Sequence, residues 1–150
     1  MDSERQVLTF AIWWHDAVHD PMAKDNEALS AEMARRDLRD FNVSIHAREE
    51  IARLIRLTAK HEVEEEDRLG EILVSIDLAI LGAGPDAYDA YSRAVREEYA
   101  HVSEEGWQLG RSAVLKSFLA ARFIYPDPAL RQRFEVQARE NLCREIAGLS

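Results

Sequence analysis

The sequence predicts an all-α protein, a compact bundle of about six or seven helices, and three observations predict it. Apolar residues recur at spacings of three and four through nearly every segment, which is the period of an amphipathic helix. No stretch shows the apolar–polar alternation of a half-buried strand. Apolar residues make up 47% of the 150 residues and charged residues 31%. A chain of this size and composition can bury a core of its own, so we expect one domain over residues 1–150.

The first helix is expected over residues 3–18, where apolar side chains mark one face at the helical spacing. Seven of the eight residues from 7 to 14 are apolar. Because a helix that is apolar on every side is normally buried, we expect this helix to be buried all round. The turn at Asp20-Pro21 closes the segment. The residues that mark the face are Val7, Phe10, Trp14 and Val18.

The next three helices are predicted from caps and apolar stripes. Asp25 or Asn26 begins a helix that runs to about residue 41. Ser44 can cap a third helix, which carries an apolar stripe up to Thr58. The acidic residues 62–67 are either the frayed end of that helix or the start of the fourth. The fourth helix has a stripe formed by Leu69, Ile72, Leu73, Ile76 and Ile80.

Two glycines and a proline in residues 81–85 make the clearest break in the chain, and they end one helix and begin another. A fifth helix is expected from this break to about Val102, and Gly106 is predicted to mark a join. A sixth helix follows to about Ala121. Residues 125–128 are read as a loop with an N-cap and a proline in the first turn of the last helix. That last helix contains the single cysteine, Cys143, which we expect to be a small core residue.

The charge and the apolar runs exclude several functions. The chain has 28 acidic and 19 basic residues and a net charge of −9, so a nucleic acid polymer is not an expected partner. No apolar run approaches the length of a membrane span, and no membrane partner is expected. One cysteine cannot form an internal disulfide, which fits a reducing compartment. A cytoplasmic location is therefore the default expectation.

Polar residues that stand inside apolar helices indicate where the chemistry lies. His15 and Asp16 follow directly after the first apolar run, and Asp77 interrupts the fourth helix. The pair at 15 and 16 has two readings, a satisfied pair at a helix end or part of a metal site. A divalent metal held by His15, Asp16 and Asp77 would satisfy all three groups. The donor types suit Mn, Fe, Co, Ni or Zn better than Ca, with Mg as an alternative.

An ordered set of short motifs carries a family resemblance. Trp14-His15-Asp16-Ala17-Val18-His19-Asp20 is followed by Asp25-Asn26-Glu27, by Thr58-Ala59-Lys60-His61 and by Asp77-Leu78-Ala79-Ile80-Leu81-Gly82-Ala83. The set resembles the HD superfamily of metal-dependent phosphohydrolases, and more closely a bacterial group of predicted HD phosphohydrolases. The resemblance covers nearly the whole chain. It implies an HD-like helical fold and hydrolysis of a small phosphoester, plausibly of a nucleotide.

The resemblance also implies roles for individual residues. Asp16 would ligate the metal and orient the attacking water, and the metal would lower the pKa of that water. His61 would protonate the leaving group or contact the phosphate, or it is simply a favourable partner of a helix C-terminus. Lys60 and Arg111 are the candidate substrate contacts, with a structural tie between helices as the alternative for Arg111. Asn26 and Glu27 are a helix start or line the mouth of the site.

The chain departs from the superfamily pattern at one metal ligand. The superfamily's metal set begins with a histidine that precedes the dyad, and residues 1–14 contain none. Either the family's first helix is absent from this sequence, as we expect, or the protein has lost this ligand. An HD-like binding or regulatory module with impaired catalysis is the alternative function. A homo-oligomer is compatible with both functions, because the missing helix would expose an apolar groove.

Overall fold

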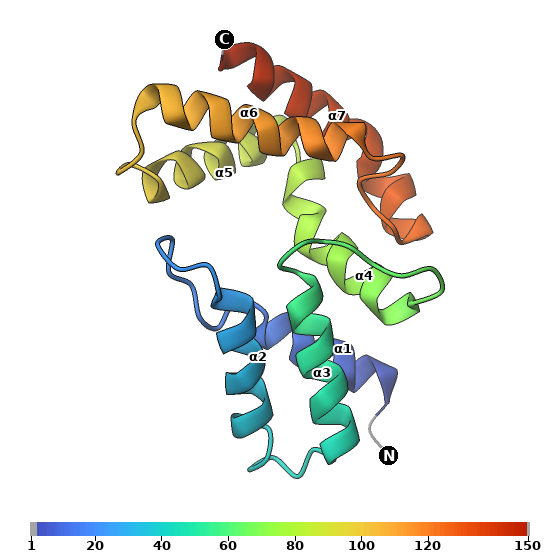
Figure 1. Cartoon of the computed structure of the whole chain (residues 1–150). Coiled ribbons are helices and arrows are strands. Elements are labelled where there is room, and N and C mark those ends of the chain that lie inside the picture. The colour runs from blue at the N-terminus through green and yellow to red at the C-terminus, as the bar shows by residue number, and fades with distance from the viewer. Residues whose placement is uncertain (1–2, 150) are drawn as a thin grey trace. The chain divides into compact units, whose positions relative to one another are not determined.

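A computed structural model describes residues 3–149, and every regular element in that range is helical (Figure 1). Seven α-helices and one short 3-10 helix make up this part of the chain, which confirms the predicted all-α fold. Contacts divide the chain into two compact units, Met1–Asp77 and Leu78–Ser150, and each is described by itself. The single domain over residues 1–150 stays a prediction. Within residues 3–149, no helix combines the length and the apolar character that a membrane crossing requires.

The first unit contains four helices packed around one apolar core. They are α1 (Glu4–Trp14), α2 (Asn26–Asp37), α3 (Ile45–Leu57) and α4 (Arg68–Asp77). Helix α1 contacts the other three, and α2 and α3 lie side by side (Figure 1). The core consists of aliphatic side chains at helical spacing, as the sequence stripes predict. Its fully buried members include Ala11, Ala31, Leu38, Ile51, Leu54 and Ile55.

The first helix differs from its prediction in length and in burial. It ends at Trp14, four residues before the expected end, and His15 is its C-cap. Trp13 is 73% exposed, so the expectation of a helix buried on all sides is wrong. The neighbouring helices pack against the face of α1 that carries Val7 and Ala11. The aromatic side chain of Trp13 points away from that face. A run of apolar letters does not reveal which side of a helix has neighbours.

The caps of the first unit follow the sequence in part. The Ser44 hydroxyl accepts a hydrogen bond from the Ala47 amide at 3.2 Å, which confirms the predicted cap of α3. Asp25 is the N-cap residue of α2, but its side chain makes no capping bond. The acidic residues 62–67 belong to the connection between α3 and α4. The last of them, Asp67, accepts the amide hydrogen of Gly70 at 3.1 Å and so fixes the first turn of α4.

The second unit begins with the 3-10 helix η1 (Leu78–Gly82) and continues with three α-helices. They are α5 (Pro85–Glu98), α6 (Glu104–Ala120) and α7 (Pro128–Gly148). Asp127 caps α7 by accepting the Leu130 amide at 2.9 Å, and Pro128 stands in the first turn, as predicted. Helix α5 ends at Glu98, short of Val102, and Ser103 caps α6. Gly106 therefore lies in the first turn of α6 and marks no join.

Two buried side chains bond to carbonyl groups in the 3-10 helix and directly after it. The Tyr125 hydroxyl donates to the Leu78 carbonyl at 2.9 Å. The Asn141 amide donates to the carbonyls of Leu81 and Ala83 at 2.9 and 2.8 Å. These bonds replace the partners that the carbonyls lose where the helix breaks. The neighbouring Cys143 is exposed, so its expected place in the core is wrong. Asn141 and Leu142 take the buried face of α7 instead.

Candidate functional site

The dyad histidine is oriented by the end of its own helix. The His15 amide donates to the Ala11 carbonyl at 2.9 Å, and the ring Nδ1 lies 2.7 Å from the Ile12 carbonyl oxygen. Because a carbonyl only accepts, Nδ1 carries the hydrogen of this bond. Nε2 is then the nitrogen that faces outward from the helix end. A histidine that ligates a metal is commonly fixed in this way by a bond from its other nitrogen to a carbonyl.

Helix α2 holds the segment that follows the dyad. The Ser30 hydroxyl is completely buried and accepts the Val18 amide at 3.0 Å. The Asn26 side chain accepts the Asp20 amide at 3.1 Å and donates to the Asp20 carbonyl at 2.9 Å. These bonds give Asn26 a positioning role beyond beginning a helix. The sequence did not reveal the role of Ser30, because a serine within a helix carries no signal of its distant partner.

Asp77 brings two histidines from different parts of the chain to one carboxylate. It is the last residue of α4, and its Oδ1 lies 3.1 Å from His15 Nε2. Its Oδ2 lies 2.8 Å from His61 Nε2. The three side chains are mostly buried, with 19%, 21% and 26% of the side chains of His15, Asp77 and His61 exposed. Polar groups that the sequence spreads over 62 positions thus meet inside the first unit.

His61 reaches Asp77 through an uncommon backbone conformation. Helix α3 ends at Leu57, and the His61 amide still donates to the Leu57 carbonyl at 2.9 Å. The φ angle of His61 is 56°, in the left-handed region that costs a side-chain-bearing residue free energy. Such a conformation persists where the surrounding structure holds it, and it is found often at functional sites. Here it accompanies the placement of the imidazole against Asp77.

The contacts in this cluster shift the protonation of its members. The hydrogen bond to Asp77 raises the pKa of His15 to about 9, although partial burial works in the opposite direction. Burial also opposes ionisation of Asp77, but the hydrogen bonds to His15 and His61 outweigh it and lower the pKa of that carboxyl to about 2. A charged imidazole therefore faces an ionised carboxylate at neutral pH. The positive charge at this point can come from a proton on Nε2 or from a cation that takes its place.

The two other candidates of this region lie at its edge. Asp16 Oδ2 is 3.4 Å from His15 Nε2, and 73% of the Asp16 side chain is exposed. Lys60 is exposed and directly precedes His61. Both side chains can therefore meet a ligand from solvent without first leaving a buried partner. The predicted roles of Asp16 and Lys60 toward metal and substrate stay predictions.

Arg111 belongs to the second unit and has its own partners there. Its guanidinium donates to Glu145 at 2.7 and 3.2 Å, and only 8% of its side chain is exposed. It also lies over the ring of Tyr91, 5.6 Å from the centroid. The Tyr88 hydroxyl donates to the same Glu145 carboxylate. The arrangement favours the structural alternative, in which Arg111 ties α6 to α7.

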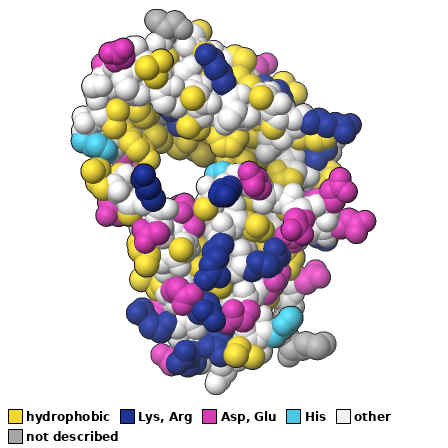
Figure 2. Space-filling model, in the orientation of Figure 1, with side chains coloured by type: hydrophobic (Ala, Val, Ile, Leu, Met, Phe, Trp, Pro, Cys, Tyr) yellow, Lys and Arg dark blue, Asp and Glu magenta, His cyan; other side chains and the backbone are white. Residues whose placement is uncertain are grey.

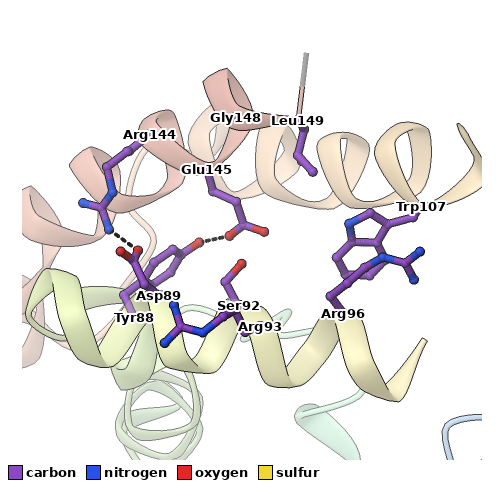
Figure 3. Close-up of a pocket in the computed structure, with 10 residues that line it drawn as sticks. All are labelled: Tyr88, Asp89, Ser92, Arg93, Arg96, Trp107, Arg144, Glu145, Gly148 and Leu149. Atoms are coloured by element: carbon purple, nitrogen blue, oxygen red, sulfur yellow. Dashed lines mark hydrogen bonds and ion pairs between the residues drawn. The ribbon is translucent and has the colours of Figure 1, made fainter. Parts of the chain in front are cut away.

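A pocket of about 370 Å³ opens beside this network in the second unit (Figure 3). Trp107 closes one end of it, and Arg96 lies over the indole ring at 5.2 Å from the centroid. Arg144 is paired with Asp89, at 2.5 Å between nitrogen and oxygen. Most charged groups of the pocket are thus already matched within the unit. The pocket is a feature of the α5–α7 packing that the sequence did not indicate.

One observation favours a metal in the first unit, and one speaks against it. Imidazole and carboxylate donors of His15, His61, Asp16 and Asp77 are the types that first-row divalent metals bind. Across residues 3–149, however, no three or more His, Cys, Asp or Glu side chains form a group that could hold a metal ion. The donors contact one another directly, at 2.8 to 3.4 Å. The donor chemistry fits, and the predicted metal ligation stays a prediction.

Comparison with models of protein families, with curated proteins and with solved structures finds no match to this chain.

Proposed function

We propose that this chain is a metal-dependent phosphohydrolase of the HD type that hydrolyses a small phosphoester, with nucleotides as the first substrates to test. His15, Asp16 and Asp77 would hold one divalent ion of Mn, Fe, Co, Ni or Zn, with Mg as an alternative. The observation that carries the proposal is the 3.1 Å approach of Asp77 to His15 Nε2. The resemblance assigns these two residues to one metal set, and they lie together although they are 62 positions apart in the sequence.

The orientation of His15 also supports the proposal. Its Nδ1 is held by the Ile12 carbonyl at 2.7 Å, which leaves Nε2 as the nitrogen directed at the two carboxylates. A neutral imidazole would present a lone pair to two anions there, which is unfavourable. A proton or a cation on Nε2 removes the conflict. A divalent ion would do so for His15 and for both carboxylates together.

The roles of the chain's own residues follow from their positions. The bound metal would supply a water of lowered pKa and a charge that stabilises the phosphoryl oxygens. The exposed Asp16 carboxylate can orient that water, since it borders solvent and His15 alike. His61 can protonate the leaving group. Lys60 can neutralise the phosphate charge from the rim, where its side chain is exposed.

One observation favours a second candidate, an HD-like binding or regulatory module. Asp77 is matched on both oxygens by His15 and His61, so the cluster is electrostatically satisfied by protons alone. A cluster of this kind can hold α3 and α4 together without any turnover. The two candidates differ in hydrolysis, since the module would release little or no phosphate with any divalent metal.

The test combines metal analysis with an activity screen. The protein is loaded with each divalent metal, desalted, and analysed for bound metal by mass spectrometry. Phosphate release is then measured from nucleotides and from an aryl phosphate. We expect about one metal per chain, with both metal and activity lost in Asp77→Asn and His15→Ala. Asp40→Asn and His46→Ala are matched controls, since Asp40 and His46 are exposed and lie outside the cluster.

The outcomes separate the candidates. Metal retention in Asp77→Asn would overturn the proposed site. Stoichiometric metal that depends on Asp77, without phosphate release from any substrate, would replace the hydrolase by the binding module. If the wild-type protein retains no metal, metal binding is ruled out for both candidates. In that case the cluster would be a structural ion-pair network.

A further inference from the structure

A second polar pocket lies on the first unit, between α2 and α3. None of the residues that line it belongs to the histidine cluster. It has a volume of about 340 Å³. Its lining contains four arginines and two glutamates, and so a surplus of two positive charges in a chain of net charge −9. Figure 2 shows basic side chains gathered among acidic ones over these helices. The lining residues are Glu32, Arg35, Arg36, Arg39, Ile45, Arg48 and Glu49.

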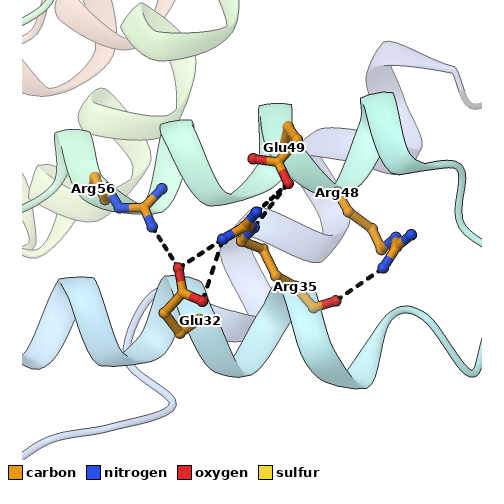
Figure 4. A network of polar contacts seen from close by, with 5 residues as sticks. All are labelled: Glu32, Arg35, Arg48, Glu49 and Arg56. Carbon is orange, nitrogen blue, oxygen red and sulfur yellow. Dashed lines mark hydrogen bonds and ion pairs between the residues drawn. The ribbon is translucent and has the colours of Figure 1, made fainter.

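The two glutamates of the pocket are already taken by one arginine. Arg35 donates to Glu49 at 2.8 and 2.5 Å and to Glu32 at 3.0 Å (Figure 4). Arg56 adds a further bond to Glu32 at 2.9 Å. A third arginine, Arg36, donates to Asp37 at 2.9 Å. The acidic groups around the pocket are thereby used up by Arg35, Arg36 and Arg56.

Arg48 and Arg39 are left with donors to spare. Arg48 makes one bond, from one terminal nitrogen to the Arg35 carbonyl at 3.3 Å (Figure 4). Its Nε is buried and is the one buried side-chain nitrogen or oxygen in residues 3–149 that lacks a hydrogen-bond partner. Arg39 is exposed, and its guanidinium has no ion pair in that part of the chain. An atom that is closed to solvent is also closed to a ligand, but the second terminal nitrogen of Arg48 makes no hydrogen bond in the described part of the chain and is not buried, so it can take an acceptor from outside the chain.

We propose that this pocket binds a phosphate group, either as inorganic phosphate or as part of a small phosphorylated molecule, through Arg48 and Arg39. The two terminal nitrogens of a guanidinium form a planar fork that matches two oxygens of a tetrahedral oxyanion, and in Arg48 only one of the two is bonded within residues 3–149, to the Arg35 carbonyl. The volume admits a small ligand. Arg39 adds a second positive charge at the open side. This inference does not depend on the metal or on hydrolysis.

The test uses inorganic phosphate as the probe and the metal-free protein in chelating buffer. Binding is measured by calorimetry and by the phosphate-dependent rise of the unfolding temperature, against chloride at matched ionic strength. Arg48→Lys keeps the charge and removes the fork, and Arg39→Gln removes an exposed charge. Arg68→Gln is the matched control, because it removes an exposed arginine of the same unit outside the pocket.

We expect the dissociation constant for phosphate to rise about tenfold or more in each pocket variant, which corresponds to the loss of one charge-assisted bond. The control should bind as the wild type does. His15→Ala should also bind normally, which separates this site from the proposed metal site. Two results would overturn the proposal. One is a wild-type protein with no phosphate binding beyond chloride, and the other is equal binding by Arg48→Lys, Arg39→Gln and Arg68→Gln.

Discussion

His61 Nε2 lies 2.8 Å from Asp77 Oδ2, and this contact joins the connection after α3 to the last residue of α4. Both groups are mostly buried. Asp77 also contacts His15, at 3.1 Å. The carboxylate therefore links three segments of the first unit, whether or not an ion binds there. Its removal should be felt in stability as well as in any function.

A double-mutant cycle measures this link. We expect His61→Ala and Asp77→Ala each to destabilise the protein, and the double variant to lose about 1 kcal/mol less than the sum, because the second change removes a partner that is already gone. Urea unfolding of the four proteins gives the coupling free energy. His46 lies in the first turn of α3, at the opposite end of that helix from His61. In a cycle of His46→Ala with Asp77→Ala, the two losses of stability should therefore be additive. Coupling of the same size in both cycles would contradict a direct contact.

The left-handed backbone of His61 predicts that glycine at this position gives a more stable protein than alanine does. Glycine adopts a φ of 56° without strain, whereas alanine does not. His61→Gly should therefore be more stable than His61→Ala, by about 1 kcal/mol, although both lose the bond to Asp77. Thermal unfolding of the two variants checks the order. The neighbouring Lys60 has no positive φ, so Lys60→Gly should be less stable than Lys60→Ala. His61→Ala equal to or above His61→Gly would count against the conformation.

The Arg111–Glu145 pair predicts an acid-dependent stability of the second unit. Burial would raise the pKa of Glu145, but the hydrogen bonds from Arg111 and Tyr88 outweigh it and lower the pKa below 4.5. Since the folded pKa is below the unfolded one, the stabilisation is present above the unfolded value and is lost as the pH falls through the folded value. Glu145→Gln should be about 1–3 kcal/mol less stable than wild type at pH 7.

The difference between these two proteins should shrink as the pH falls below 4.5, where the wild-type carboxylate becomes protonated. Urea unfolding as a function of pH measures it. Glu140→Gln is the control, because Glu140 is an exposed residue of the same helix. A constant difference across the acid range would show that the charge of Glu145 contributes nothing.

Two glycines of the second unit should respond in opposite directions to alanine. A Cβ at Gly82 would lie 2.6 Å from Phe134 Cβ and 2.8 Å from the Phe134 carbonyl oxygen. Gly82→Ala should therefore cost about 1–3 kcal/mol, since η1 or α7 must shift. Gly110 is inside α6, and a Cβ there meets no atom within 4 Å. Gly110→Ala should stabilise the protein by about 1 kcal/mol through helix propensity. Thermal unfolding distinguishes the two, and a stable Gly82→Ala variant would disprove the close packing.

Features that depend on neighbouring residues in the sequence could be predicted. The helical class, the Ser44 cap and the Asp127–Pro128 start of α7 are local, because a cap bonds to amides only two or three residues away. Their predictions are confirmed. The predicted ends of α1, α2 and α5 lie four residues too far along the chain, because the apolar period continues past the point where the backbone leaves the helix.

Features that depend on which face of a helix meets a neighbour were decided by the tertiary structure. Trp13 and Cys143 are exposed although each stands in an apolar or helical pattern. The buried bond of Ser30 to Val18 and the Glu145 partner of Arg111 have no counterpart in the sequence pattern. Hydrophobic periodicity fixes the angle of a side chain around its own helix and gives no information about the neighbour across from it.

The candidate site shows both contributions. The sequence singled out His15, Asp16 and Asp77, because charged and imidazole groups beside apolar runs need partners, and the family resemblance added His61. Only the tertiary structure decided that Asp77 is the partner of both histidines, and that Arg48 of the α2–α3 pocket keeps a buried donor without one. A need for a partner is a property of the residue, whereas the identity of the partner is set by how the helices pack.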